Sequence, residues 1–160
     1  MSDISILLAQ FDAGPGLLAD AIAGLSVDQL NATPVPERWT VHQVVCHIAD
    51  FEIVSADRVR RVLAEENPTL ADGDPDLFAT GLKYGQRDTE SELGQIKAIR
   101  RSLSQILHAC DIEDFQRTAV HSADGPLTLE TLVERITNHI SHHVRFIEEK
   151  RQAMDVLQDS

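Results

Sequence analysis

The chain has 160 residues, of which 42% are hydrophobic and 25% are charged, and this length fits one domain with a core of its own. Its 26 acidic residues outnumber its 14 Lys and Arg, and the net charge of −12 disfavours nucleic acid and anionic membrane surfaces as partners. No apolar run reaches the roughly 18 residues of a membrane span, and the first residues lack the basic leader of a signal peptide. The two isolated cysteines, Cys46 and Cys110, indicate reduced thiols and a cytoplasmic location.

The first predicted element is one helix over residues 4–25. Its apolar residues recur at steps of three and four, and this periodicity continues in phase across Pro15. We therefore expect one helix with a kink at Pro15 rather than two helices. Residues 26–29 resemble a capping box that opens a short turn, and residues 33–38 form an extended connection that contains two prolines.

The second predicted helix starts at a capping box in residues 40–43 and carries an apolar stripe that fades near Glu65. Residues 66–87 contain five glycines and prolines, which predicts a long loop. A loop of this length inside a small domain is often functional. Within it, Asp74 before Pro75 predicts a single capped helical turn.

Two further helices complete the pattern. The third is predicted from Thr89 to about Cys110, and the fourth from a cap at Thr128 to about Met154. Residues 124–126 form a turn before the fourth helix. Each helix has its apolar residues on one side, which is typical of helices that pack around a shared core.

Four amphipathic helices and no credible strand predict an all-α four-helix bundle. We expect a single domain over residues 1–154 and a frayed tail over residues 155–160. The long connection between the second and third of these helices predicts that the topology is not simply up-and-down.

The fourth helix carries three histidines within five residues. At about 100° per residue, His143 falls inside the apolar stripe and His139 at its edge. These two residues are four apart and lie one turn from each other on one face, so their imidazoles can converge on a single ion. His142 falls well outside the stripe, and we expect it to face solvent.

The second helix offers a third imidazole. His47 lies at the margin of the apolar stripe, whereas His42 is predicted to face solvent. We expect His108 and His121 to be surface or loop residues. His47, His139 and His143 together form a three-histidine set that suits zinc or nickel and leaves a coordination position for water or substrate. The alternative is that each is an ordinary packed or surface histidine.

Two segments resemble signatures of the DinB-like superfamily of metal-binding four-helix bundles. Residues 38–50 are similar to its second-helix signature, and residues 125–143 to its fourth-helix signature. The residues between them that resemble the family in order and spacing are residues 66–70, Tyr84 and Arg100/Arg101. The resemblance covers roughly residues 4–153.

The resemblance implies a bundle with a non-sequential helix order and a divalent metal held by His47, His139 and His143. Relatives in this superfamily include S-transferases that use bacillithiol, mycothiol or glutathione, and a maleylpyruvate isomerase. A low-molecular-weight thiol is therefore an implied second cofactor. Phe146 stands where the family often has glutamine, three residues after the last histidine.

Two charged residues are further candidates. Asp50, one turn from His47, could accept an imidazole N–H or act as a catalytic base for metal-bound water, and the alternative is a solvated carboxylate. Arg100 falls inside the stripe of the third helix and could bind the carboxylate of a substrate or thiol cofactor. The alternative for Arg100 is snorkelling or pairing with a buried glutamate. Cys46 points away from the stripe and lacks a basic neighbour, so it is not predicted to be a nucleophile.

The sequence supports two functional hypotheses. The first is an enzyme whose metal activates a thiol or water for attack on a small electrophilic substrate. The second is a non-catalytic metal-binding scaffold or stress-response protein. Retention of an open coordination position beside a pocket distinguishes the first from the second. Assembly as a homodimer is compatible with both.

Overall fold

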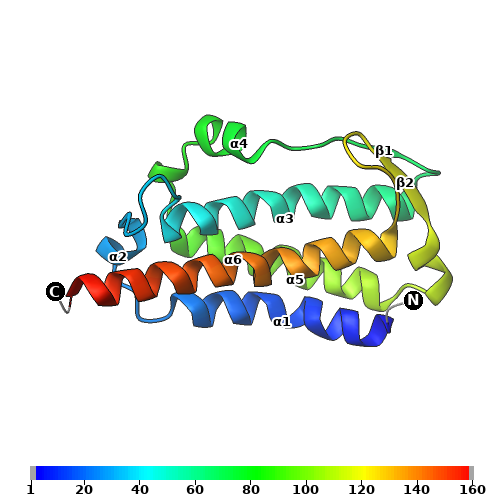
Figure 1. Cartoon of the computed structure of the whole chain (residues 1–160). Helices are drawn as coiled ribbons and strands as arrows, with labels where there is room; N and C mark the ends of the chain where they lie inside the picture. The colour runs from blue at the N-terminus through cyan, green and yellow to red at the C-terminus, as the bar shows by residue number, and fades with distance from the viewer. Residues whose placement is uncertain (1–2, 159–160) are drawn as a thin grey trace.

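Four long helices dominate the computed structural model, which describes residues 3–158 and the side chains through residue 155 (Figure 1). They are α1 (Ile4–Ile22), α3 (Val41–Ala64), α5 (Thr89–His108) and α6 (Leu129–Gln158). The predicted four-helix bundle is confirmed, and Pro15 lies inside a single first helix. None of the described helices combines the length and apolar character needed to cross a membrane. The predicted tail, residues 155–160, falls partly within α6 and partly outside the described residues.

The helices begin where the sequence places their caps. Thr40 Oγ1 accepts a hydrogen bond from Gln43 N at 3.1 Å, and the Gln43 side chain accepts in return from Thr40 N at 2.9 Å. A matching box at Ser26 opens the short helix α2 (Val27–Asn31). Thr128 Oγ1 accepts from Thr131 N at 3.2 Å at the start of α6. The cap of α5 is Asp88, one residue before the predicted start of that helix.

The helix order around the bundle is not sequential. Both α1 and α3 pack against α5 and α6, so α1 and α3 lie diagonally opposite each other. Figure 1 shows that residues 65–88 return along the length of the bundle, so α3 and α5 run in the same direction. This connection contains α4 (Pro75–Gly81), which Asp74 caps as predicted, and the 3₁₀ turn η1 (Tyr84–Gln86).

A small sheet corrects the expectation that the chain has no strand. β1 (Thr69–Leu70) pairs in parallel with β2 (Thr118–His121), which follows the 3₁₀ segment η2 (Ile112–Gln116). β2 pairs antiparallel with β3 (Gly125–Thr128). The strands have only two to four residues, too few for an alternating pattern to stand out in the sequence. The sheet ties the long connection to the start of α6.

The apolar core has two parts that meet at one level of the bundle. Phe11, Leu103 and Val133 belong to one cluster, and Leu18 and Ile48 belong to the other. The level between the clusters is occupied by buried polar groups and a glycine, namely Gly14, Glu52 and Arg100. A Cβ atom on Gly14 would lie 3.4 Å from Arg100 Nη1 and 3.2 Å from Ile140 Cδ1, so the glycine makes room for the guanidinium.

Candidate metal centre

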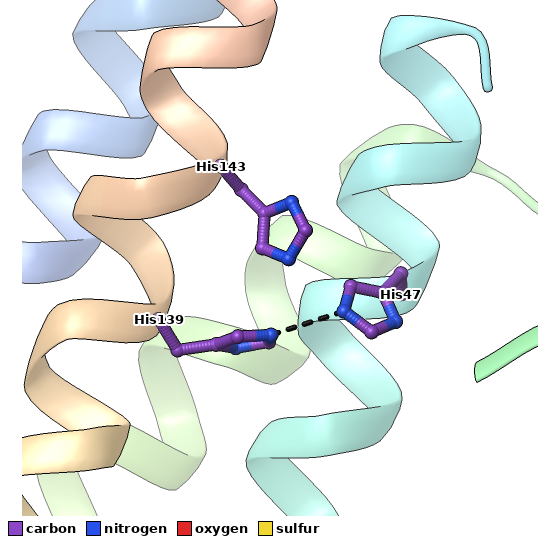
Figure 2. A group of neighbouring side chains, drawn as sticks. All are labelled: His47, His139 and His143. Carbon is purple, nitrogen blue, oxygen red and sulfur yellow. Dashed lines mark hydrogen bonds between the residues drawn. The ribbon is translucent and has the colours of Figure 1, made fainter. Parts of the chain in front are cut away.

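Three histidines from two helices converge between α3 and α6. His47 projects from the second turn of α3, and His139 and His143 project from successive turns of α6 (Figure 2). One nitrogen from each ring can be chosen so that all three lie within 4.8 Å of one another. Nε2 of His47 and Nε2 of His139 are 3.0 Å apart. The structure therefore brings together the three histidines that the helical periodicity singled out.

Burial keeps the three imidazoles neutral. Burial, and then the neighbouring His143, lowers the pKa of His47 to about 3. Burial, followed by the charges of His47 and Arg100, lowers the pKa of His139 to about 3. Burial, followed by His139 and His142, does the same for His143. At neutral pH each ring therefore offers a free lone pair, which is the form that binds metal.

The geometry of the cluster fits a divalent ion. Zinc binds imidazole nitrogen at about 2.0–2.1 Å, so two nitrogens on one tetrahedral ion lie about 3.4 Å apart. The 3.0 Å between His47 Nε2 and His139 Nε2 is close to that spacing. His47 Nδ1 is buried without a hydrogen-bond partner in the described part of the chain, so the polar contacts of this ring lie within the cluster. Burial of three neutral imidazoles costs free energy that metal coordination offsets.

The donor set leaves room for a further ligand. Within residues 3–155, the cluster includes no carboxylate, no thiol and no fourth imidazole. Three histidine ligands are typical of catalytic zinc sites, in which a fourth position is taken by water or substrate. A structural site is normally closed by four protein ligands. The arrangement thus resembles a catalytic site more than a structural one.

Aromatic side chains form one wall of the cluster. The His47 ring lies 5.1 Å from the Trp39 ring and 4.6 Å from the Phe51 ring, measured between centroids. The ring of Phe78, in α4, lies 5.2 Å from the ring of Phe51, so the long connection packs against this wall. The apolar rings of Trp39 and Phe51 lower the local polarity around the histidines, which strengthens electrostatic interactions between the histidines and a bound ion.

Two other histidines correct the sequence prediction. His42, expected to face solvent, is buried, with Nε2 donating to the carbonyl oxygen of Tyr84 and Nδ1 bonded to Thr89 Oγ1, each at 2.7 Å. It thus fastens α3 to η1 and to the start of α5. His121, expected to be a surface or loop residue, is instead buried at the end of strand β2, where Nδ1 accepts from Asp124 N at 3.3 Å. The segments that cover these residues come from distant parts of the sequence.

The exposed histidines are where they were expected. His142 faces solvent on α6, and Arg145 Nη2 lies 3.3 Å from its Nδ1. His108 is also exposed and pairs with Asp12 across 2.9 Å. Because His142 is adjacent to His143 and yet outside the cluster, it provides a matched control for experiments on the metal centre.

Asp50 is buried and bound to an arginine. Its Oδ2 accepts from Arg87 Nη1 at 2.7 Å, and Arg87 also pairs with Glu92 of α5. The alternative of a solvated carboxylate is therefore wrong. Among the described residues, the Asp50 carboxylate accepts from Arg87, and no hydrogen bond joins it to an imidazole. The ion pair anchors the end of the long connection against α3, on the helix that carries His47.

Cys46 is buried in the same region of α3. Its Sγ lies 3.6 Å from His42 Nε2, and burial raises the pKa of the thiol to about 12. A thiol that is protonated and fully covered is a poor nucleophile. The sequence prediction that Cys46 is not a nucleophile agrees with this environment, although its burial was not foreseen.

Arg100 lies inside the bundle with protein partners on all sides. Its Nε and Nη2 donate to the two carboxylate oxygens of Glu52, each at 2.7 Å. Nη2 also donates to the carbonyl oxygen of Ile136 at 2.7 Å, and Nη1 donates to that of Phe11 at 3.1 Å. The side chain is 2% exposed. This is the pairing with a buried glutamate that the sequence left open as the alternative to binding a cofactor.

Comparisons with known proteins agree with this architecture. A protein of Oceanobacillus iheyensis named "Putative metal-dependent hydrolase OB0413" is 24% identical over 151 residues, which are 92% of this chain and 84% of that protein. A Bacillus cereus protein named "Putative metal-dependent hydrolase BCB4264_A2719" is 27% identical over 141 residues, with 88% of this chain and 81% of that protein covered.

A solved structure has the same fold. YfiT from Bacillus subtilis, described as "a probable metal-dependent hydrolase with an unusual four-helix bundle topology", superposes with a TM-score of 0.90 and 23% identity. The match covers 97% of this chain and 90% of YfiT. The sequence profile of the DinB superfamily matches residues 10–147, which are most of the bundle and include all three clustered histidines. The chain therefore belongs to the DinB superfamily.

Proposed function

We propose that His47, His139 and His143 hold a divalent ion, zinc or nickel, and that the protein is a metal-dependent enzyme. In this proposal the enzyme activates water or a low-molecular-weight thiol for attack on a small electrophilic substrate. The observation that carries the proposal is the convergence of three neutral imidazoles within 4.8 Å, without a fourth ligand among the described residues. The names of the Oceanobacillus and Bacillus relatives favour water, and the superfamily's S-transferases favour a thiol.

The metal ion and the protein residues make different contributions to the proposed reaction. A divalent ion, when bound, lowers the pKa of a water or thiol at its open position toward neutrality. The chain supplies the ligands, and it supplies the rings of Trp39 and Phe51 that limit water beside His47. The attacking oxygen or sulfur would give up its proton to a base and bond to the electrophilic atom, while the bond from that atom to the leaving atom breaks and its electron pair goes to the leaving atom, which stays attached in the case of an epoxide.

Asp50 is the candidate proton acceptor on the chain. It lies one helical turn from His47, and Arg87 holds its carboxylate in place at 2.7 Å. If the carboxylate accepts a proton during turnover, Asp50→Asn should lower kcat and leave the metal content unchanged. If Asp50 only anchors the long connection, Asp50→Asn should instead lower the melting temperature, and the metal content should fall together with it.

The test of the proposal begins with the metal content of the purified protein and continues with cobalt substitution. We expect about one divalent ion per chain and hydrolysis of activated esters or amides, or consumption of an epoxide or alkyl halide in the presence of a thiol. A sulfur-to-cobalt charge-transfer band on adding bacillithiol, mycothiol or glutathione assigns the thiol reaction. Turnover without any thiol assigns hydrolysis.

The variant pair for this experiment is His143→Ala and His142→Ala. Loss of bound metal and of turnover in the first, with both retained in the second, supports the proposal. A protein that binds metal and turns over none of these substrates would instead be the metal-binding scaffold. A protein that binds no metal under any condition would exclude both readings.

A further inference from the structure

A cavity beside the histidine cluster carries two cations. The cavity has a volume of about 240 Å³, and its lining includes His143, Trp39 and Phe146. Arg38, from the segment before α3, and Lys150, from α6, also line it. Two side chains with positive charge therefore share a small space next to a proposed metal ligand, in a protein whose net charge is −12.

Neither cation has a carboxylate within ion-pair distance in the described part of the chain. Lys150 is 5% exposed, and its Nζ makes one long hydrogen bond, 3.5 Å, to the carbonyl oxygen of Phe146. Among the described residues, the ion pairs include neither Lys150 nor Arg38. A buried ammonium group with unused donors costs free energy unless an anion binds it. The acidic residue in the lining, Glu37, is exposed, and so is Glu149, whose charge acts on the neighbouring Lys150.

The rest of the cavity is aromatic. Lys150 Nζ lies 6.0 Å from the centre of the Phe146 ring, and that ring lies 6.0 Å from the His143 ring. On the other side, Trp39 contacts the ring of His47 at 5.1 Å. An apolar group bound between Trp39 and Phe146 would therefore be adjacent to the histidine cluster. An anionic group attached to it could bind Arg38 and Lys150.

We propose that the substrate of this site is a small carboxylate with an apolar body, and that Arg38 and Lys150 bind its carboxylate. Trp39 and Phe146 flank the apolar body and direct the reacting group toward His143. The inference rests on the proposed function, because it names the substrate class of the same site. The cavity is smaller than the 300–1,000 Å³ typical of drug-sized ligands, which predicts a compact substrate.

Titration with cyclohexanecarboxylate and with its neutral analogue cyclohexanecarboxamide tests the inference. Trp39 is the single tryptophan of the chain, so its fluorescence reports binding in this cavity, and calorimetry provides a second readout. Neither probe absorbs where the tryptophan is excited. We expect the metal-free protein to bind the carboxylate at least about tenfold more tightly than the amide, because charge-assisted hydrogen bonds are the stronger ones.

Variants assign the effect to individual residues. Arg38→Gln and Lys150→Met should each weaken carboxylate binding about tenfold and leave amide binding unchanged. Arg38 is exposed, so its variant keeps the fold even if Lys150→Met does not. Glu37→Gln should strengthen carboxylate binding because it removes a repelling charge. Lys97→Gln, in a separate cavity between α1 and α5, is the matched control and should change nothing.

Three results would overturn the inference. The first is that the protein binds the carboxylate and the amide with equal affinity. The second is that Arg38→Gln and Lys150→Met both keep the wild-type affinity for the carboxylate. The third is that neither probe binds at millimolar concentration. Carboxylate binding could also require metal, and be lost in His143→Ala but not in Arg38→Gln. That result would mean that the carboxylate binds the metal ion itself, which supports the proposed function and not this inference. Carboxylate binding to a protein that takes up no metal would support an anion site at Arg38 and Lys150, but it would contradict the proposed function and with it the assignment of the carboxylate as a substrate.

Discussion

Glu52 and Arg100 form a two-pronged ion pair inside the bundle, with both nitrogen–oxygen distances at 2.7 Å. The pair lies at the level where the two apolar clusters meet, and Arg100 also binds the carbonyl oxygen of Ile136 one turn before His139. After burial and His47, the charge of Arg100 contributes to the lowered pKa of His139. Arg100 thus holds the segment of α6 that presents the histidines and helps to keep His139 neutral.

Removal of one partner of this ion pair should destabilise the fold strongly. Glu52→Ala or Arg100→Met leaves a buried charge without its counter-charge, which costs about 3–5 kcal/mol of the free energy of unfolding. The double variant Glu52→Leu/Arg100→Met should cost less than either single change, because no buried charge remains. Urea denaturation measures all three. Arg61→Ala, which breaks only exposed pairs, is the control and should leave stability nearly unchanged.

Metal affinity should depend on the clustered histidines alone. Alanine at His47, His139 or His143 removes one of three ligands and should reduce affinity by orders of magnitude, as measured by competition with a chromophoric chelator. His142→Ala should keep wild-type affinity because that ring faces solvent. His42→Ala should lower the melting temperature without changing affinity. Release of metal by His142→Ala but not by His143→Ala would contradict the assignment.

Acid should destabilise the metal-free protein through the same histidines. Their pKa is about 3 in the folded state, whereas the ordinary value is 6.5, so the unfolded chain binds more protons between these pH values. The free energy of unfolding should therefore fall as the pH drops from 6.5 toward 3, because the unfolded chain takes up protons there that the folded chain does not. Denaturation curves across this range measure the slope. His139→Gln should reduce the slope, and an unchanged slope would contradict the role of burial.

Removal of the metal should leave the bundle folded. The apolar stripes of the four long helices form the core without the histidines, so the chelated protein should keep its helical circular-dichroism spectrum. Its melting temperature should be lower, because a ligand that binds only the folded state stabilises that state. A random-coil spectrum after chelation would show instead that the metal is required for folding.

Duplex DNA should not bind at physiological salt. Binding needs clustered Lys or Arg that release counterions from the phosphates, and the net charge of −12 opposes it. Fluorescence anisotropy of a labelled duplex of arbitrary sequence measures this directly. Micromolar binding that weakens as salt is raised would contradict the prediction.

Local features of the molecule could be predicted from the sequence because they depend on residues that are close together in the chain. The boxes at Ser26 and Thr40 join a cap to a residue three positions later, so they are visible as short motifs. The apolar periodicity likewise places His139 and His143 on one face of one helix, whatever that helix packs against.

Contacts between distant segments were decided by the tertiary structure. A helical wheel assigned His42 to the solvent side of α3, yet η1 and Thr89 cover it, because the wheel shows direction and not what packs there. The strands escaped detection because pairing between Leu70 and His121, and not a local pattern, creates them.

The candidate site combines both kinds of information. The 3.6-residue repeat was enough to place His139 and His143 on one face of α6 and His47 at the margin of the apolar stripe of α3, because it depends only on positions within one helix. Only the packing of α3 against α6 decided that His47 reaches His139 at 3.0 Å, because this depends on how far one helix slides along the other. The same packing decided that Arg100 is bound by Glu52 and that Arg38 and Lys150 share a cavity, since the members of each pair are far apart in sequence and meet only when the bundle closes.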